Sequence, residues 1–177
     1  MEDGAANHPG MRMRLRLWGR LSPIGLAFAV LTFGFDQAHK AFMLHSFRIA
    51  ERQPVEVMPF FDLVLVWNRG VSYGWFAQHT AFGRFGLVAL SLVASFGLWI
   101  WLARTERPLT AAALGLVIGG ALGNALDRVI YGAVADFFLL HWRGFDWYVF
   151  NIADLAIVAG VGLLLYDSWS EDARRRA

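Results

Sequence analysis

Residues 109–128 read LTAAALGLVIGGALGNALDR, eighteen uncharged residues followed directly by an Asp-Arg pair. Within this run small residues recur every four positions, and an aspartate continues the series: Ala111, Gly115, Gly119, Gly123 and Asp127. Residues four apart share one face of a helix, and small side chains there let two helices approach closely. A bilayer core of about 30 Å requires about 20 helical residues. The stretch therefore predicts a membrane-spanning helix over 108–127, with a packed face that ends in a carboxylate.

The composition of the whole chain also indicates a membrane protein. Of its 177 residues, 57% are hydrophobic and 17% are charged, whereas a soluble domain has about 25% charged residues. So apolar a chain has ample surface to bury, which excludes disorder. The net charge of +2 is not gathered into a basic face with interleaved aromatic residues, so we expect no nucleic-acid partner. The absence of cysteine excludes disulfides, thiolate catalysis and cysteine metal sites.

Three further apolar runs have lengths close to that of a membrane span. Together with the first they predict one integral membrane domain over 1–177, an all-α bundle with spans near 20–40, 85–103, 108–127 and 147–167. Basic residues crowd the span ends in three groups, which four spans would place on one side: Arg12, Arg14, Arg16 and Arg20; Arg104 and Arg107; and Arg174, Arg175 and Arg176. We take that side as cytoplasmic, with both termini and a tail over 1–19 inside. A cleaved signal peptide is the alternative, but the Ala27-Phe28-Ala29 triplet lies within the apolar run instead of after it.

The two outer segments differ in length. In the longer one, over 41–84, apolar and polar residues alternate between Val55 and Trp67, and Asn68-Arg69-Gly70 has the composition of a turn. This alternation predicts a small β-sheet that lies on the outer membrane surface. The shorter segment, over 128–146, is expected to be a loop.

Four carboxylates fall at the outer ends of the spans: Asp36, Asp127, Asp136 and Asp154. The sequence places Asp136 in the last outer loop and Asp154 about two turns into the fourth span. Ionisable residues at such positions are costly and usually functional. Asn124 and Asn151 each precede an aspartate by three residues and share its helix face. This spacing favours Asp127 and Asp154 as a facing pair.

Each carboxylate also has a purely structural interpretation. Asp127 could pair with Arg128 at a helix end, and Asp36 could pair with Lys40 one turn away. Asp136 could be a solvated loop acid, and Asp154 could serve only as a hydrogen-bond acceptor. The last interpretation is the weakest, because twelve uncharged residues follow Asp154.

Two carboxylates that face each other at a membrane edge share one proton, because they cannot both ionise. The ionised one can then take a proton from water while the protonated one polarises a carbonyl, which is aspartic-protease chemistry. Other hydrolytic sites are unsupported, since the five histidines lack HExxH spacing. Gly70-Val71-Ser72-Tyr73-Gly74 matches G-x-S-x-G, but the chain cannot build the α/β sheet that a nucleophile elbow needs. A proton-coupled carrier also uses membrane carboxylates and remains the alternative, although no inverted repeat is present.

At these residues the sequence resembles the bacterial lipoprotein signal peptidases, also called signal peptidase II or prolipoprotein signal peptidase. Five stretches carry the resemblance in the order of the family: Asp36-Gln37-Ala38-His39-Lys40, Asn68-Arg69-Gly70-Val71-Ser72, residues 119–128, Val134-Ala135-Asp136-Phe137, and Phe150-Asn151-Ile152-Ala153-Asp154. Any one would be weak, but five in order are specific.

The resemblance implies a membrane aspartic endopeptidase that cuts before the diacylglyceryl-modified cysteine of a prolipoprotein. It places the catalytic pair on Asp136 and Asp154, whereas the spacing favours Asp127 in place of Asp136. It assigns supporting or substrate-binding roles to Asp36, Lys40, Asn68, Gly70, Asn124, Asp127, Arg128, Asn151 and Ala153. It also implies four spans, with an extracytoplasmic cradle sheet and a short surface helix. We expect a monomer in the bacterial inner membrane, in contact with lipids, with its site on the extracytoplasmic face and with no cofactor or metal.

Overall fold

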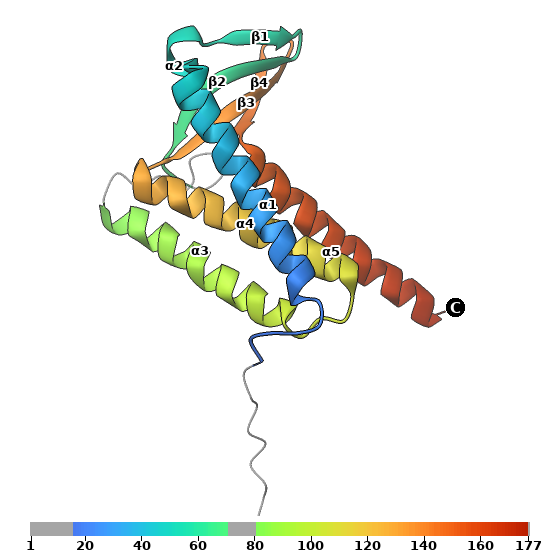
Figure 1. Ribbon diagram of the computed structural model, residues 1–177. Coiled ribbons are helices and arrows are strands. Elements are labelled where there is room, and N and C mark those ends of the chain that lie inside the picture. Colours follow the sequence, from blue (N-terminus) through green and yellow to red (C-terminus); the bar gives the residue numbers. More distant parts are fainter. Residues whose placement is uncertain (1–15, 71–80, 177) are drawn as a thin grey trace, which may run out of the picture.

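The computed structural model describes residues 16–70 and 81–176 and consists of a helix bundle with a β-sheet at one end (Figure 1). The elements follow in the order α1 (Ser22–Ala41), the π-helix η1 (Phe42–Ser46), α2 (Ile49–Arg52), β1 (Val55–Met58), β2 (Phe61–Asn68), α3 (Ala81–Leu102), α4 (Pro108–Ile130), β3 (Val134–Trp142), β4 (Phe145–Phe150) and α5 (Ile152–Arg176). The chain returns to the sheet after α4, so strands from two distant segments meet above the bundle.

Helix α4 is the centre of the bundle and packs against α1, α3 and α5. Its apolar window is 67% buried, whereas that of α3 is 11% buried. A methyl group at Gly115 would lie 2.3 Å from the carbonyl oxygen of Gly25, and one at Gly119 would lie 2.5 Å from that of Ala29. The predicted stripe of small residues is therefore confirmed as the face that packs on α1. Gly120 faces α5 in the same way, with its nearest contact at the carbonyl oxygen of Ala153.

The sheet has four antiparallel strands in the order β1-β2-β3-β4. The first two strands come from the alternating stretch, as predicted. The other two come from the segment expected to be a loop, so Asp136 lies on β3 and pairs with Val66 of β2. Residues 147–150 of the predicted fourth span belong to β4, and α5 begins only at Ile152. Asp154 consequently lies in the first turn of α5, not two turns into it.

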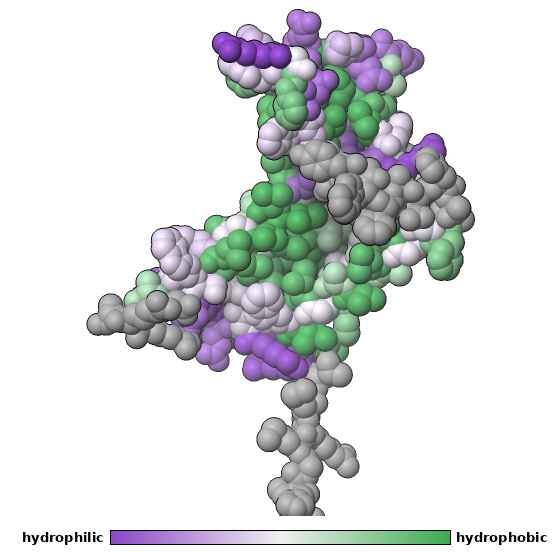
Figure 2. Space-filling view, turned by 180° about the vertical axis from the view of Figure 1, so that it is seen from behind, coloured by the Kyte–Doolittle hydropathy of each residue, from purple (hydrophilic) through white to green (hydrophobic). Residues whose placement is uncertain are grey.

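Within the described residues, three helical segments are long and apolar enough to cross a membrane: Phe82–Leu102, Pro108–Ile130 and Ile152–Glu171. Figure 2 shows the hydrophobic surface over the helices between more polar surface at the sheet and at the opposite end. Many large apolar side chains on this surface are exposed, among them Leu31, Val93 and Val158 at 70% each. Such a surface is suited to lipid. Helix α1 has 20 residues, but Asp36 and Lys40 lie near its C-terminal end.

Candidate active site

Asp154 and Asn151 cap the first turn of α5 reciprocally. The amide N–H of Asp154 donates to Asn151 Oδ1 at 2.9 Å, and the amide N–H of Asn151 donates to Asp154 Oδ2 at 3.2 Å. This is the geometry of a capping box, in which two amides at a helix start are satisfied by side chains. The three-residue spacing read from the sequence thus fixes Asp154 at the end of the helix nearest the sheet.

Asp136 is held by amide side chains on both of its oxygens. Asn151 Nδ2 donates to Oδ1 at 2.6 Å, and Asn68 Nδ2 donates to Oδ2 at 3.1 Å. The residue is only 1% exposed. Burial and the neighbouring charge of Asp154 raise the pKa of Asp136 to about 7, against the hydrogen bonds from the two asparagines. A carboxyl group in this setting can exist in either protonation state near neutral pH.

Asn124 of α4 links the two aspartates to the rest of the bundle. Its Nδ2 donates to Asp154 Oδ1 at 2.9 Å, while its Oδ1 accepts from Asn151 Nδ2 at 3.1 Å and from Lys40 Nζ at 3.2 Å. Asn151 in turn contacts both aspartates. Asp136 and Asp154, 18 positions apart in the chain, therefore belong to one hydrogen-bonded network.

The other two carboxylates surround a buried ammonium group. Lys40 Nζ lies 2.8 Å from Asp36 Oδ2 and 2.7 Å from Asp127 Oδ2, and all three side chains are almost fully buried. Asp36 also accepts from the amide of Ala153 at 3.0 Å, and Asp127 accepts from the amide of Ala135 at 3.2 Å. The pairing of Asp36 with Lys40 matches its structural interpretation. These two carboxylates fix the start of α5 and the start of β3.

Arg128 does not pair with Asp127, contrary to the structural interpretation of that sequence pair. Its guanidinium donates to the carbonyl oxygen of Gly70 at 2.7 Å and to that of Asn124 at 3.1 Å. Asp127 instead forms an ion pair with Lys40 of α1. Arg128 therefore ties the end of β2 to α4 beside the two aspartates.

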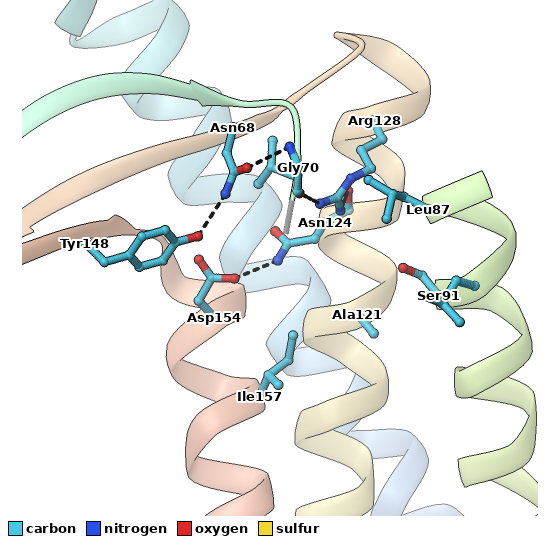
Figure 3. Close-up of a pocket in the computed structure, with 12 residues that line it drawn as sticks. Asn68, Gly70, Leu87, Ser91, Ala121, Asn124, Arg128, Tyr148, Asp154 and Ile157 are labelled. Atoms are coloured by element: carbon cyan, nitrogen blue, oxygen red, sulfur yellow. Dashed lines mark hydrogen bonds between the residues drawn. The ribbon is translucent and has the colours of Figure 1, made fainter. Parts of the chain in front are cut away.

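A cavity of about 300 Å³ opens beside Asp154 (Figure 3). Its polar end is lined by Asn68, Gly70, Asn124, Arg128, Tyr148 and Asp154. Its other walls come from α3, α4, α5 and the start of β3: Leu87, Leu90, Ser91, Ala121, Ile157 and Val134. Asp136 does not line this cavity and is joined to it through Asn68. The cavity therefore offers an apolar channel that ends at a carboxylate, a guanidinium and two amides.

The network contains two residues to which the sequence analysis assigns no role. Gln37 donates to Asp127 Oδ1, Asp36 Oδ2 and the carbonyl oxygen of Gly123, and its position between Asp36 and Lys40 in the quoted motif was the available signal. Tyr148 accepts from Asn68 at 2.8 Å, and nothing in its local sequence singles it out. Ser72 lies outside the described residues. Among residues 16–70 and 81–176, no three His, Asp or Glu side chains are grouped so that they could hold a metal ion.

Comparisons with known proteins agree on one family. The model of the family described as signal peptidase (SPase) II matches residues 28–170. A lipoprotein signal peptidase of Methylobacterium sp. (strain 4-46) is 54% identical over 84% of this chain and 90% of its own length. One from Rhodopseudomonas palustris (strain ATCC BAA-98 / CGA009) is 49% identical over 82% of this chain and 91% of its own length. A solved structure of a bacterial membrane enzyme superposes with a TM-score of 0.74 at 25% identity, covering 86% of this chain and 91% of that one.

Proposed function

We infer the activity from one premise: this chain belongs to the signal peptidase II family. It is a membrane-embedded protease that hydrolyses the peptide bond joining the signal peptide of a prolipoprotein to the rest of that chain. We propose that the bond lies directly before a cysteine that carries a diacylglyceryl group, and that Asp136 and Asp154 are the catalytic pair.

The observation that carries this assignment is the kind of group that surrounds each aspartate. Asn68, Asn124 and Asn151 donate to Asp136 and Asp154, whereas Asp36 and Asp127 are neutralised by Lys40. Amide donors do not neutralise charge, so two nearby carboxyl groups held by amides are suited to share one proton.

In the proposed reaction a water molecule binds between the two carboxyl groups. The ionised aspartate takes a proton from this water as the oxygen attacks the scissile carbonyl carbon, and the protonated aspartate donates its proton to the carbonyl oxygen. The resulting neutral diol collapses and the carbon–nitrogen bond breaks. The aspartate that gained the proton passes it to the leaving amine, while the other aspartate takes a proton from one diol hydroxyl and is again protonated. The products are a carboxyl-terminated signal peptide and a lipoprotein with a free amino group on its cysteine.

The remaining predicted residues support this pair from outside. Asp36 accepts from the amide of Ala153, and Asp127 accepts from the amide of Ala135. Each of these amides is adjacent to a catalytic aspartate, and Lys40 pairs with both accepting carboxylates. Arg128 and Gly70 hold the end of β2 against α4, beside the cavity in which we place the scissile bond.

We place the site at the extracytoplasmic edge of the inner membrane. In this arrangement α1 crosses the membrane together with α3, α4 and α5, both termini are cytoplasmic, and the sheet is the cradle that lies on the outer surface. The apolar walls formed by Leu87, Leu90 and Ile157 suit the signal helix, while the lipid chains stay in the outer leaflet. Burial of the site beneath the sheet excludes bulk water and strengthens electrostatic interactions there.

Replacing each aspartate tests the assignment. We expect Asp136→Asn and Asp154→Asn each to lower cleavage of a purified diacylglyceryl prolipoprotein by about 10²–10⁴-fold, because each removes one proton-transfer group. Asp146→Asn, an exposed position on β4, is the matched control and should retain activity.

Each variant is first shown to fold by its thermal transition in detergent. Full cleavage by a folded Asp136→Asn or Asp154→Asn protein would remove that residue from the mechanism. Proton flux in proteoliposomes without any cleavage by the wild type would support the carrier instead.

A further inference from the structure

Tyr148 lies on β4 and lines the cavity opposite Arg128 (Figure 3). Its ring is partly buried, and its hydroxyl oxygen accepts a hydrogen bond from Asn68 Nδ2 at 2.8 Å. Asn68 lies at the end of β2, and its carboxylate partner Asp136 lies on β3, between β2 and β4 in the sheet. Tyr148 therefore reaches Asp136 through one intervening side chain.

The amide of Asn68 is held at three points. The backbone N–H of Gly70 donates to Asn68 Oδ1 at 3.0 Å, which turns the amide oxygen toward Gly70. Asn68 Nδ2 then donates to Asp136 Oδ2 at 3.1 Å and to Tyr148 at 2.8 Å. A primary amide has two N–H groups, so both are used, one on each acceptor. In one and the same orientation, the amide of Asn68 donates one N–H to Asp136 and the other N–H to Tyr148.

We propose that Tyr148 is a positioning residue for the cleavage reaction, which acts by holding the amide of Asn68 against Asp136. This inference rests on the proposed role of Asp136. Tyr148 does not exchange a proton with the substrate in this scheme. It limits the rotation of Asn68, so that the carboxyl group of Asp136 keeps one direction toward the reacting water.

Loss of the phenolic hydroxyl has a defined electrostatic consequence. The hydrogen bond from Asn68 stabilises the ionised form of Asp136 and opposes the rise of its pKa. When Asn68 is less firmly held, this bond weakens and the pKa of Asp136 rises further. The charged groups that surround Asp136 from the helices remain in place: Asp36 and Lys40 of α1, Asp127 and Arg128 of α4, and Asp154 of α5. A change in the pH profile of kcat would therefore indicate a change in the hydrogen bond from Asn68 to Asp136.

Tyr148→Phe tests the inference because it removes one oxygen atom and keeps the ring. With purified full-length enzyme and a diacylglyceryl prolipoprotein, we expect kcat to fall about three- to tenfold, the size of one hydrogen bond. KM should stay within about twofold. Because the charge of Asp154 raises the pKa of Asp136, Asp136 loses the later proton of the pair, so the basic limb of the kcat profile should move to higher pH by roughly half a unit. Tyr131→Phe is the matched control, since Tyr131 packs on Trp67 outside the cavity, and it should leave kcat and the profile unchanged.

A double-mutant cycle separates the route through Asn68 from a direct effect. In an Asn68→Ala background, Tyr148→Phe should have no further effect on kcat. An unchanged profile with a raised KM would overturn the inference and make Tyr148 only a wall of the substrate site. A shift of the basic limb to lower pH would also overturn it. Either result leaves the proposed function standing as long as Asp136→Asn is inactive.

Discussion

Two groups of carboxylates lie side by side at the sheet end of the bundle, and they are built from different partners. Asp36 and Asp127 share the ammonium group of Lys40, at 2.8 and 2.7 Å. Asp136 and Asp154 are held by asparagine amides, and among the described residues neither makes an ion pair. The first group is a buried ion triad whose positions are fixed by charge. The second is a pair of acids held by amide donors, which we propose to share the proton used in cleavage.

The difference shows why four aspartates at one end of a bundle need not share one role. A cation between two carboxylates engages both of them in ion pairs, as Lys40 does with Asp36 and Asp127. Amide donors fix direction without supplying charge, so the proton remains available. Asn124 touches both groups, because it accepts from Lys40 and donates to Asp154. The ion triad thereby positions the acid pair without neutralising it.

The largest effect on stability is expected from Lys40→Met. This change leaves Asp36 and Asp127 buried without a counter-ion, which costs about 3–5 kcal/mol of unfolding free energy. A large fall in the thermal transition of the detergent-solubilised protein would measure it. The double variant Lys40→Met with Asp127→Asn should recover part of the loss, since one unpaired charge is removed. If Lys40→Met unfolds like the wild type, the two groups of carboxylates are not different in kind.

Asn124→Ala should damage both groups at once. It removes the acceptor for Lys40 and Asn151 and the donor to Asp154, so we expect a loss of about 1–3 kcal/mol in stability and of about tenfold or more in cleavage.

Asn124→Asp is the matched variant for this position. It keeps an acceptor for Lys40 but replaces the donor to Asp154 Oδ1 by a second carboxyl oxygen, and two facing carboxyl groups cannot both ionise. We therefore expect Asn124→Asp to be no more active than Asn124→Ala. Full activity of Asn124→Asp would show that the donor to Asp154 is not required.

The smallest effect concerns the pH dependence of stability. The folded pKa of Asp136 is raised to about 7 from 3.8, so the folded protein binds the extra proton between these values. The wild type therefore loses stability as pH rises through this range. Relative to Asp136→Asn, which cannot ionise there, we expect a loss on the order of 1–2 kcal/mol, or about 2–8 °C, between pH 5 and pH 6.5.

Thermal transitions of the two proteins, measured in one detergent at both pH values, give this difference. If the transition temperatures of the two proteins change equally between the two pH values, Asp136 ionises in the folded protein as readily as in the unfolded chain.

Much of the bundle was predictable because it depends on local spacing. Uncharged runs predict helices, and the four-residue recurrence of Gly115, Gly119 and Gly123 predicts the packed face of α4. The three-residue step from Asn151 to Asp154 likewise brings two side chains together within one turn. Such patterns can be read from the chain because a helix relates neighbours in sequence to neighbours in space.

The sheet and the partners of the acids depend on contacts between distant residues. The sequence predicts a loop up to residue 146 and the start of a helix from residue 147. Pairing of β3 with β2, and of β4 with β3, makes these residues strands instead. Spacing also favoured Asp127 over Asp136, because nothing local indicates that Lys40 would take Asp127.

The sequence by itself determined where helices form, which face of α4 packs and which residue types gather at one end of the bundle. Tertiary structure alone decided which carboxylate meets an ammonium group and which meets an amide. Lys40 and Asn124 are 84 positions apart, and Asn68 and Asp136 are 68 apart. Their contacts exist because α1 crosses α4 and because β2 pairs with β3. Hydrogen bonds and ion pairs are short-ranged and directional, so these distant placements decide which aspartates keep a proton to exchange.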